Sequence, residues 1–260
     1  PLLEVVQGDK TSKMVMAQAM SFAKRLRKIA VPVGVCEGFV GNRMLTAYRR
    51  EASFLLEEGA SVSEVDTALY DFGMAMGPFV MTDMAGLDIS WAARKRLAAS
   101  ADPSVRDSKI GDTLCEMGRF GQKSLAGYYR YDAGSRTPIV DPIVAEVIQQ
   151  CAQQAGISQQ SWQADDIVRR TMYALINEGV HLLAEGIAQR ASDIDLVYVH
   201  GYGFPAYRGG PMFYADTIGL ARVYQQILDW EQQYGKHWTP SPLFAQLVQQ
   251  QKTLADYQPH

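Results

Sequence analysis

The chain begins with two short apolar runs that flank a helical pattern. Strands are predicted at residues 2–6 and 31–35, because both runs are rich in β-branched residues and Gly8-Asp9 ends the first. Between them, apolar residues recur at helical spacing: Val15, Ala19, Phe22, Ala23 and Leu26. Residues 1–36 therefore predict a β-α-β unit. Because two strands rarely make a stable sheet alone, we expect this unit to be the end of a larger sheet.

After Gly38 the pattern is helical. One apolar helix face is marked by Met44, Leu45, Tyr48, Ala52, Leu55 and Leu56. Gly59 is placed to end that helix, and Ser61 with Glu64 has the spacing of a capping box for the next. Pro78 is suited to the first turn of a further helix. The chain is therefore predicted to be mainly α.

The helical pattern occurs twice in the same order. The repeated features are Leu55-Leu56-Glu57-Glu58-Gly59 and Leu182-Leu183-Ala184-Glu185-Gly186, Asp66 and Asp195, Gly73 and Gly203, Gly77-Pro78 and Gly210-Pro211, Asp83 and Asp216, and Gly86-Leu87 and Gly219-Leu220. The alternative is that the residues which start and end helices match by chance in the two stretches. A tandem copy would make, within one chain, the contact that a two-fold dimer makes between chains.

These patterns predict four parts. Residues 1–36 are the terminal β-α-β piece, and residues 37–131 form the first helical domain. Residues 132–164, which contain Gly134, Pro138 and Pro142, are predicted as a linker with a short helix. Residues 165–260 form a second, degenerate copy of the helical domain.

Composition narrows the class of protein. The chain is 47% hydrophobic and 20% charged, with a net charge of −3, so a nucleic-acid surface is not expected. No apolar run reaches the length of a transmembrane segment. The three cysteines form no CxxC pair and no histidine has metal-ligand spacing, which favours a reducing compartment and no metal site.

Glu4 and Asn42 are the candidate catalytic residues. Glu4 lies in an apolar strand, where it could orient a histidine and stabilise its charged form, or simply face solvent at the strand end. The amide of Asn42 could donate to a substrate oxygen, or the residue could be a helix cap. Its counterpart in the second copy is Arg169, so at most one copy is expected to be catalytic.

Three further residues could contact ligands. Lys123 follows Gly118 and Gly121 on a tight loop, where it could meet a phosphate or ribose, although the spacing is not that of a phosphate-binding loop. Met76 and Phe79 could line an acyl-sized pocket or belong to the helix core. A solvated lysine is the plainer interpretation of Lys123.

Together these segments resemble L-3-hydroxyacyl-CoA dehydrogenase, and the second copy resembles the extra C-terminal domain of the multifunctional fatty-acid oxidation enzymes. The matching segments are residues 1–6, 38–43, 76–79 with Asp83 and 86–88, 118–123, 200–205 and 209–212. The resemblance implies two tandem helical domains of the 6-phosphogluconate-dehydrogenase C-terminal-like type. A remnant of a Rossmann-type NAD domain would precede them.

The resemblance also implies a reaction and roles. A 3-hydroxyacyl-CoA is oxidised to the 3-ketoacyl-CoA with NAD, and a histidine partnered by a glutamate at the position of Glu4 takes the hydroxyl proton. Asn42 matches an active-site asparagine near substrate and cofactor. Lys123 matches a lysine near the cofactor, and Met76 and Phe79 match the acyl-chain neighbourhood. The implied partners are the acyl-CoA, the second helical domain, and a thiolase subunit or a second copy of the chain.

The chain differs from the family pattern in several ways, and these differences set what we expect of it. The family's histidine and glycine-rich dinucleotide loop would lie outside these residues, with an enoyl-CoA hydratase module upstream, so the chain alone is expected to be inactive. NAD would be bound mainly by a domain that the chain lacks. Leu125 stands where the family has glycine. The ending Tyr257-Gln258-Pro259-His260 is not of the Ser-Lys-Leu type, which favours a bacterial cytoplasmic enzyme over a peroxisomal one. The rival hypotheses are a non-catalytic helical assembly module and another two-domain dehydrogenase.

Overall fold

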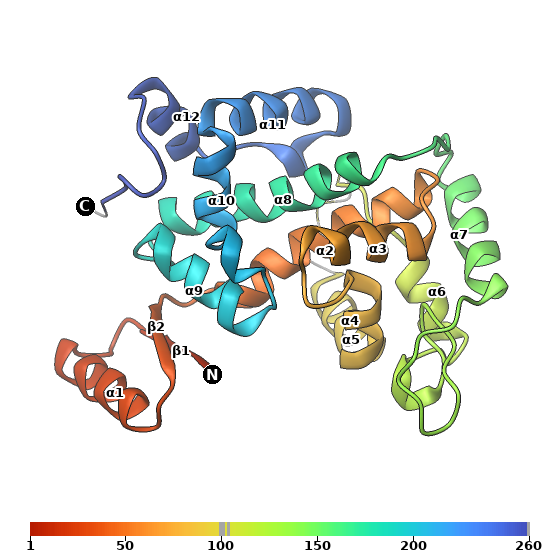
Figure 1. Ribbon diagram of the computed structural model, residues 1–260, viewed down its shortest axis with the longest axis horizontal. Coiled ribbons are helices and arrows are strands. Elements are labelled where there is room, and N and C mark those ends of the chain that lie inside the picture. Colours follow the sequence, from red (N-terminus) through yellow and green to blue (C-terminus); the bar gives the residue numbers. More distant parts are fainter. Residues whose placement is uncertain (99–101, 103–104, 259–260) are drawn as a thin grey trace. The chain divides into compact units, whose positions relative to one another are not determined.

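The chain, drawn in Figure 1, folds as two units: the first is built from two segments distant in the sequence, and the second from one continuous segment. The computed structural model describes residues 1–98, 102 and 105–258. The first unit combines residues 1–48 with residues 172–260, and the second comprises residues 49–171. Both units take residues from both copies of the repeat, so this division does not test the predicted domain boundaries, which stay a prediction.

The first unit begins with the predicted β-α-β segment, which is confirmed. Strand β1 (Leu2–Val6) and strand β2 (Ile29–Val33) pair in parallel, with Glu4 opposite Val31. Helix α1 (Lys13–Arg25) connects them, and the Ser12 side chain caps it by accepting from the Val15 amide. The helix is amphipathic as expected, but its apolar side chains Val15, Phe22 and Leu26 are exposed.

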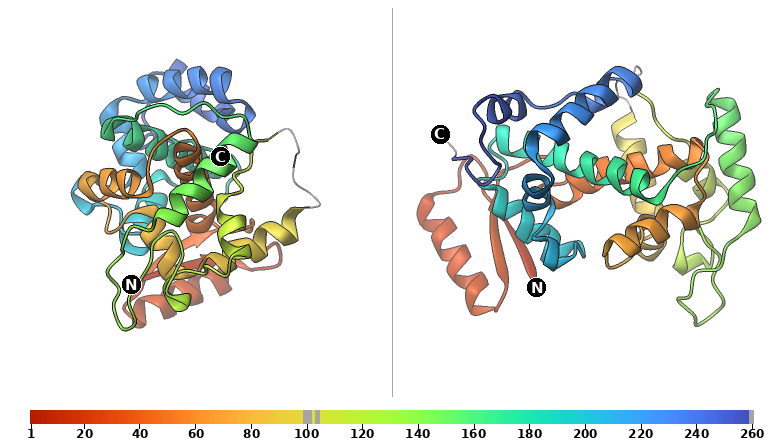
Figure 2. Two further views of the ribbon diagram at one scale, coloured as in Figure 1. Left: turned by 90° about the vertical axis from the view of Figure 1, so that its right-hand side faces the viewer. Right: turned by 45° about the horizontal axis from the view of Figure 1, so that its top comes forward.

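The rest of the first unit is helical, and Figure 2 gives two further views of these helices. It contains the first half of α2 (Gly41–Glu57), the second half of α8 (Ala164–Ala184), α9 (Ala191–Gly201), α10 (Pro211–Ile218), α11 (Leu220–Tyr234), α12 (Pro242–Gln249) and the 3-10 turns η3 (Ala206–Arg208) and η4 (Lys236–Trp238). Helix α9 packs on both strands. A Cβ at Gly179 would lie 2.6 Å from Met212 Sδ, so α8 and α10 approach closely there.

The second unit contains the other halves of α2 and α8 and the elements between them. These are α3 (Val62–Phe72), α4 (Pro78–Ala85), α5 (Leu87–Leu97), α6 (Ile110–Glu116), the 3-10 turn η2 (Gln122–Ser124) and α7 (Pro142–Gln154). The capping box predicted at Ser61 and Glu64 is present, and Gly73 ends α3 in the left-handed conformation. Helix α7 buries Val144, Val147 and Ile148.

Buried charges join segments within the second unit. Arg170, whose side chain is 1% exposed, binds Glu51 at 2.8 Å and Glu58 at 3.3 Å. Arg106 binds Glu57 and Glu58, both at 2.6 Å. Because buried carboxylates are tolerated only when paired, these arginines fix the end of α2 against the start of α8 and against residue 106.

The two copies use the same carboxylate contacts. Asp66 in α3 accepts hydrogen bonds from the amides of Phe79 and Val80, at 2.9 and 3.0 Å, in the first turn of α4. Asp195 in α9 accepts from the amides that begin α10, those of Met212 and Phe213, at 2.8 and 3.3 Å. In each copy the carboxylate satisfies amides that the following helix leaves unpaired.

The repeated glycines and the second repeated aspartate also make equivalent contacts in the two copies. A Cβ at Gly77 or at Gly210 would lie 2.3 Å from the carboxylate that precedes it, Asp66 or Asp195. Farther on, Asp83 accepts from the amides of residues 128 and 129, and Asp216 from those of residues 254 and 255. The Asp, Gly-Pro and Asp order of the sequence is therefore one folding unit built twice.

Candidate functional site

Glu4 is held at the start of α2. Its Oε1 atom accepts hydrogen bonds from the backbone amides of Val40 and Gly41, at 3.0 and 3.2 Å. These are amides that a helix N-terminus leaves unpaired, and its dipole favours an anion there. The other oxygen, Oε2, has no hydrogen-bond donor among the residues that the structure describes. The Glu4 carboxylate is thus stabilised in an apolar strand by the amide of a residue 36 positions later, a contact that the sequence pattern did not reveal.

Asn42 lies beside this contact, in the first turn of α2, with its side chain exposed. The Tyr202 hydroxyl donates to Asn42 Oδ1 at 3.0 Å. Within the described part of the chain, no acceptor faces Asn42 Nδ2, so the amide can donate to a ligand. Glu4 and Asn42 are therefore brought together in one unit, through consecutive residues of the same helix start.

Tyr202 was missed by the sequence analysis. It occurs in the segment 200–205 that carries part of the resemblance, but no local pattern pairs it with a residue 160 positions earlier. The pKa of Tyr202 is raised to about 12, first by burial and then by the negative charge of Glu4. The phenol therefore stays protonated and can act as a donor at neutral pH.

Lys123 belongs to the other unit. It lies in η2, and its Nζ atom pairs with Asp88 Oδ1 at 2.5 Å, with both side chains about half exposed. The hydrogen bond from Lys123 lowers the pKa of Asp88. Leu125, which follows this turn, has φ 59°, so its backbone adopts the left-handed conformation that glycine favours.

Phe79 and Met76 are placed differently from one another. Phe79 is 3% exposed and its ring centroid lies 4.5 Å from that of Tyr128, so in this structure it is part of the packed core. Met76 is half-buried just before α4. Periodicity alone could not separate a residue that lines a pocket from one that fills the core.

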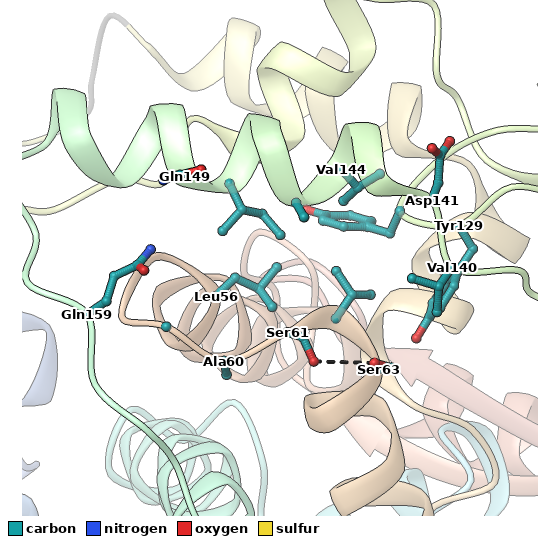
Figure 3. Close-up of a pocket in the computed structure, with 15 residues that line it drawn as sticks. Leu56, Ala60, Ser61, Ser63, Tyr129, Val140, Asp141, Val144, Gln149 and Gln159 are labelled. Carbon is teal, nitrogen blue, oxygen red and sulfur yellow. Dashed lines mark hydrogen bonds between the residues drawn. The ribbon is translucent and has the colours of Figure 1, made fainter.

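A cavity of about 360 Å³ lies within the second unit, along the end of α2, the start of α3 and α7 (Figure 3). Its wall combines apolar side chains such as Leu56 and Val144 with the polar Ser61 and Gln149. None of the predicted site residues lines it. The cavity is therefore separate from the site that the sequence indicated.

The residues present do not fit the pyrophosphate of a dinucleotide. A dinucleotide loop joins a strand to a helix with glycines at three fixed positions. Between β1 and α1 there is one glycine, Gly8, and Ser12 caps the helix. A Gly-x-Gly-x-x-Ala spelling at residues 201–206 follows α9 rather than a strand. In the described ranges there is also no cluster of three His, Cys, Asp or Glu that could hold a metal, and no helix long and apolar enough to cross a bilayer.

Comparison with known proteins identifies the repeated unit. The family model for the C-terminal domain of 3-hydroxyacyl-CoA dehydrogenase matches residues 38–131 and again residues 167–255. The peroxisomal bifunctional enzyme of Danio rerio is 44% identical over 95% of this chain and 36% of its own length. A peroxisomal fatty-acid β-oxidation multifunctional protein of Arabidopsis thaliana is 34% identical over 95% of this chain and 34% of its own length. The chain thus spans about a third of these relatives.

Solved structures agree with this fold. The dehydrogenase part of multifunctional enzyme 1 from C. elegans is 26% identical with a TM-score of 0.72, over 94% of this chain and 56% of that one. A 3-hydroxybutyryl-CoA dehydrogenase from Escherichia coli has the same fold with a TM-score of 0.77 at 22% identity, over 96% of this chain and 67% of that one.

The predicted location in a bacterial cytoplasm is wrong, since the relatives are named as peroxisomal or glyoxysomal enzymes. The cysteine criterion separates oxidising from reducing compartments and cannot separate two reducing ones. The last residues of a chain that spans a third of its relatives say nothing about a targeting signal of the whole protein. What the double match does establish is membership: the chain belongs to the 3-hydroxyacyl-CoA dehydrogenase C-terminal domain family and carries that domain twice.

Proposed function

We propose that the chain is the substrate-side part of an NAD-dependent 3-hydroxyacyl-CoA dehydrogenase within a multifunctional fatty-acid β-oxidation enzyme. The substrate loses a hydride from C3 to NAD⁺ and a proton from its 3-hydroxyl group, giving the 3-ketoacyl-CoA, NADH and H⁺. The double family match and the names of the multifunctional relatives support this reaction. The same names support a peroxisomal location for the full enzyme.

The geometry of Glu4 carries the proposal. Two backbone amides hold Oε1, so the carboxylate has a fixed position, while Oε2 lacks a donor within the described residues. A carboxylate held in this way can accept from a histidine ring and stabilise the imidazolium that forms when the histidine takes the hydroxyl proton. We assign that histidine to a part of the enzyme outside this chain.

Asn42 complements Glu4 in this proposal. Its Nδ2 atom is free to donate, and its position in the first turn of α2 places it next to the amides that hold Glu4. A donor there can bind a substrate oxygen and strengthen its hydrogen bond as charge develops on that oxygen. The proposed roles of Lys123 near the cofactor, and of Met76 and Phe79 near the acyl chain, rest on the resemblance alone.

NAD would be bound mainly by a domain that this chain lacks. Besides the missing glycine loop, β1 and α1 expose apolar side chains that a larger nucleotide-binding sheet would cover: Leu3, Met14, Val15, Phe22 and Leu26. NAD supplies the hydride acceptor when bound, and the residues of this chain position the proton-transfer pair and the substrate. The hydratase module and the thiolase or homodimer partner stay predictions.

The test compares this 260-residue chain with the full-length protein, using acetoacetyl-CoA and NADH. The full-length protein is expected to oxidise NADH, and the chain alone is expected to show no turnover and no measurable NADH binding. Turnover by the purified chain would refute the assignment of the histidine and the nucleotide site to other residues. Normal turnover of full-length Asn42→Ala would instead favour a non-catalytic assembly module.

A further inference from the structure

The residue that contacts Asn42 comes from the second copy of the helical domain. Tyr202 is the C-cap of α9, and its backbone amide bonds to the Tyr198 carbonyl oxygen. The two tyrosine rings stack with centroids 5.0 Å apart and planes 24° apart. Tyr198 is 1% exposed, and its hydroxyl donates to the Gly41 carbonyl oxygen at 3.1 Å. The Tyr202 ring is therefore anchored on a buried partner.

Gly41 makes room for this ring. A Cβ at Gly41 would lie 2.3 Å from Cε2 and Oη of Tyr202, well inside any permitted contact. Gly41 does not have a positive φ, so glycine is needed here because a side chain would not fit and not because of the backbone conformation. Nearby, a Cβ at Gly201 would lie 2.5 Å from Leu2 Cδ2, so the end of α9 also packs closely on β1. Two glycines thus bring the end of α9 against the two segments that carry Glu4 and Asn42.

The contact with Tyr202 bears on how the Asn42 side-chain amide is held. A side-chain amide can present either its oxygen or its nitrogen to a ligand, depending on a rotation of half a turn. In this structure the Tyr202 hydroxyl donates to Oδ1, which holds the amide with Nδ2 turned away from the ring. The hydroxyl could equally accept from Nδ2 in the flipped orientation, so the contact fixes the place of the amide, and a ligand oxygen that accepts from Nδ2 selects the orientation. Nδ2 then remains the group offered to a ligand, and the tyrosine keeps its proton at neutral pH, as described above.

We propose that Tyr202 is a positioning residue for Asn42: the second copy of the domain supplies a hydroxyl that holds the Asn42 amide in the place from which its nitrogen donates to the substrate. This inference rests on the proposed function. It gives the second copy, which has Arg169 at the position of Asn42, a specific part in the site of the first copy. The duplication is then a source of a site residue as well as of packing surface.

The experiment uses Tyr202→Phe in the full-length protein that contains this chain, assayed with acetoacetyl-CoA and NADH. Loss of one hydrogen bond to a positioned amide is expected to lower kcat about threefold to tenfold. KM for the acyl-CoA should change by less than about twofold, because the loss falls on the transition state rather than on uniform binding. Unchanged kcat would overturn the inference.

A second measurement separates positioning from a general structural effect. In single-turnover experiments with enzyme in excess, Tyr202→Phe should have no further effect in an Asn42→Ala background, because the two changes remove one interaction. An equal fall of the single-turnover rate constant in the wild-type and the Asn42→Ala backgrounds would overturn the proposal. If instead Asn42→Ala alone leaves turnover intact, the proposed function fails, and the role of Tyr202 fails with it.

Tyr257→Phe is the matched control. It removes a tyrosine hydroxyl from the same unit, where Oη donates to the Leu183 carbonyl oxygen at 3.0 Å, the same length as the contact to Asn42. It is expected to leave kcat unchanged. Equal losses in Tyr257→Phe and Tyr202→Phe would show that kcat follows stability, and would overturn the positioning role.

Discussion

Arg43 and Arg170 occupy equivalent positions in the two copies, and each binds the equivalent pair of glutamates in the other copy. Positions 43, 51 and 58 correspond to positions 170, 178 and 185, at one constant offset of 127 residues. The ion pairs are Arg43 with Glu178 at 2.6 Å and with Glu185 at 2.5 Å, and Arg170 with Glu51 at 2.8 Å and with Glu58 at 3.3 Å. Each pair lies inside one unit.

This reciprocity is the property of a two-fold interface, in which residue i contacts j and j contacts i. Here both partners belong to one chain, so the duplicated helices α2 and α8 provide for each other what a second subunit provides in a dimer. The pairs differ in burial, however. Arg170 is 1% exposed and Arg43 23%, so the same chemistry operates in two environments.

Replacing each arginine by methionine should therefore have unequal costs. Arg170→Met removes the guanidinium that binds the fully buried Glu51 at 2.8 Å, and should lower the free energy of unfolding by about 3 kcal/mol or more. Arg43→Met breaks partly exposed pairs and should cost about 1 kcal/mol or less. Urea unfolding of the 260-residue chain measures both. Equal losses would contradict the argument from burial.

The duplication could be predicted from the sequence because it appears as an ordered series of residue types. Asp66, Gly77 and their counterparts have fixed spacings, and the structure supplies the reason, since each aspartate fills the space that a glycine leaves. The ionic pairing could not be predicted. Arg170 and Glu51 are 119 positions apart, and no local period links them.

The burial of individual side chains could not be predicted from the apolar pattern either. Periodicity identified α1 correctly as an amphipathic helix, yet Phe22 on its apolar face is 59% exposed, because a pattern shows which face is apolar and not what covers it. Phe79 shows the converse. Its residue type suited an acyl pocket equally well, but the ring of Tyr128 packs on it. Both outcomes depend on segments distant in the sequence.

Stability should fall as pH rises between about 5 and 7. Burial raises the pKa of Asp195 from its ordinary 3.8 to about 7, although the Met212 and Phe213 amides act in the opposite direction. Between these two values the folded chain holds a proton that the unfolded chain has released. Unfolding then releases a proton, so its free energy decreases with pH, by at most about 1.4 kcal/mol per pH unit for this group.

Asp195→Asn removes this contribution and should make the pH dependence shallower. Urea midpoints at several values from pH 5 to pH 7 give the slope. Part of the slope remains, since burial also raises the pKa values of Asp66 and Asp83 to about 6. Asp132→Asn, at an exposed position, should leave the slope as it is. An unchanged slope in Asp195→Asn would show that Asp195 is ionised throughout this range.

Leu125→Gly should not destabilise the protein. Leu125 has φ 59° and is 44% exposed, so its side chain contributes little packing while its backbone adopts a conformation that costs a non-glycine residue about 1 kcal/mol. Glycine relieves that strain but adds freedom to the unfolded chain, and we expect stability to be unchanged or higher by up to about 1 kcal/mol. Ile89→Gly, at an exposed position inside α5, should instead cost about 1 kcal/mol. Similar losses at both positions would contradict the strain argument.

Substitutions of Glu4 should separate its structural contact from its proposed chemistry. In Glu4→Gln the side-chain oxygen can still accept from the Val40 and Gly41 amides, so stability should change little. The charge that stabilises an imidazolium is lost, and kcat of the full-length enzyme should fall about a hundredfold or more. Glu4→Ala also leaves both amides unpaired and should cost a further 1–3 kcal/mol or so of stability.

Glu64→Gln, which alters another carboxylate that accepts from a backbone amide, is the control and should leave kcat intact. A stable Glu4→Gln enzyme with normal kcat would reduce Glu4 to a helix cap supplied by the neighbouring strand.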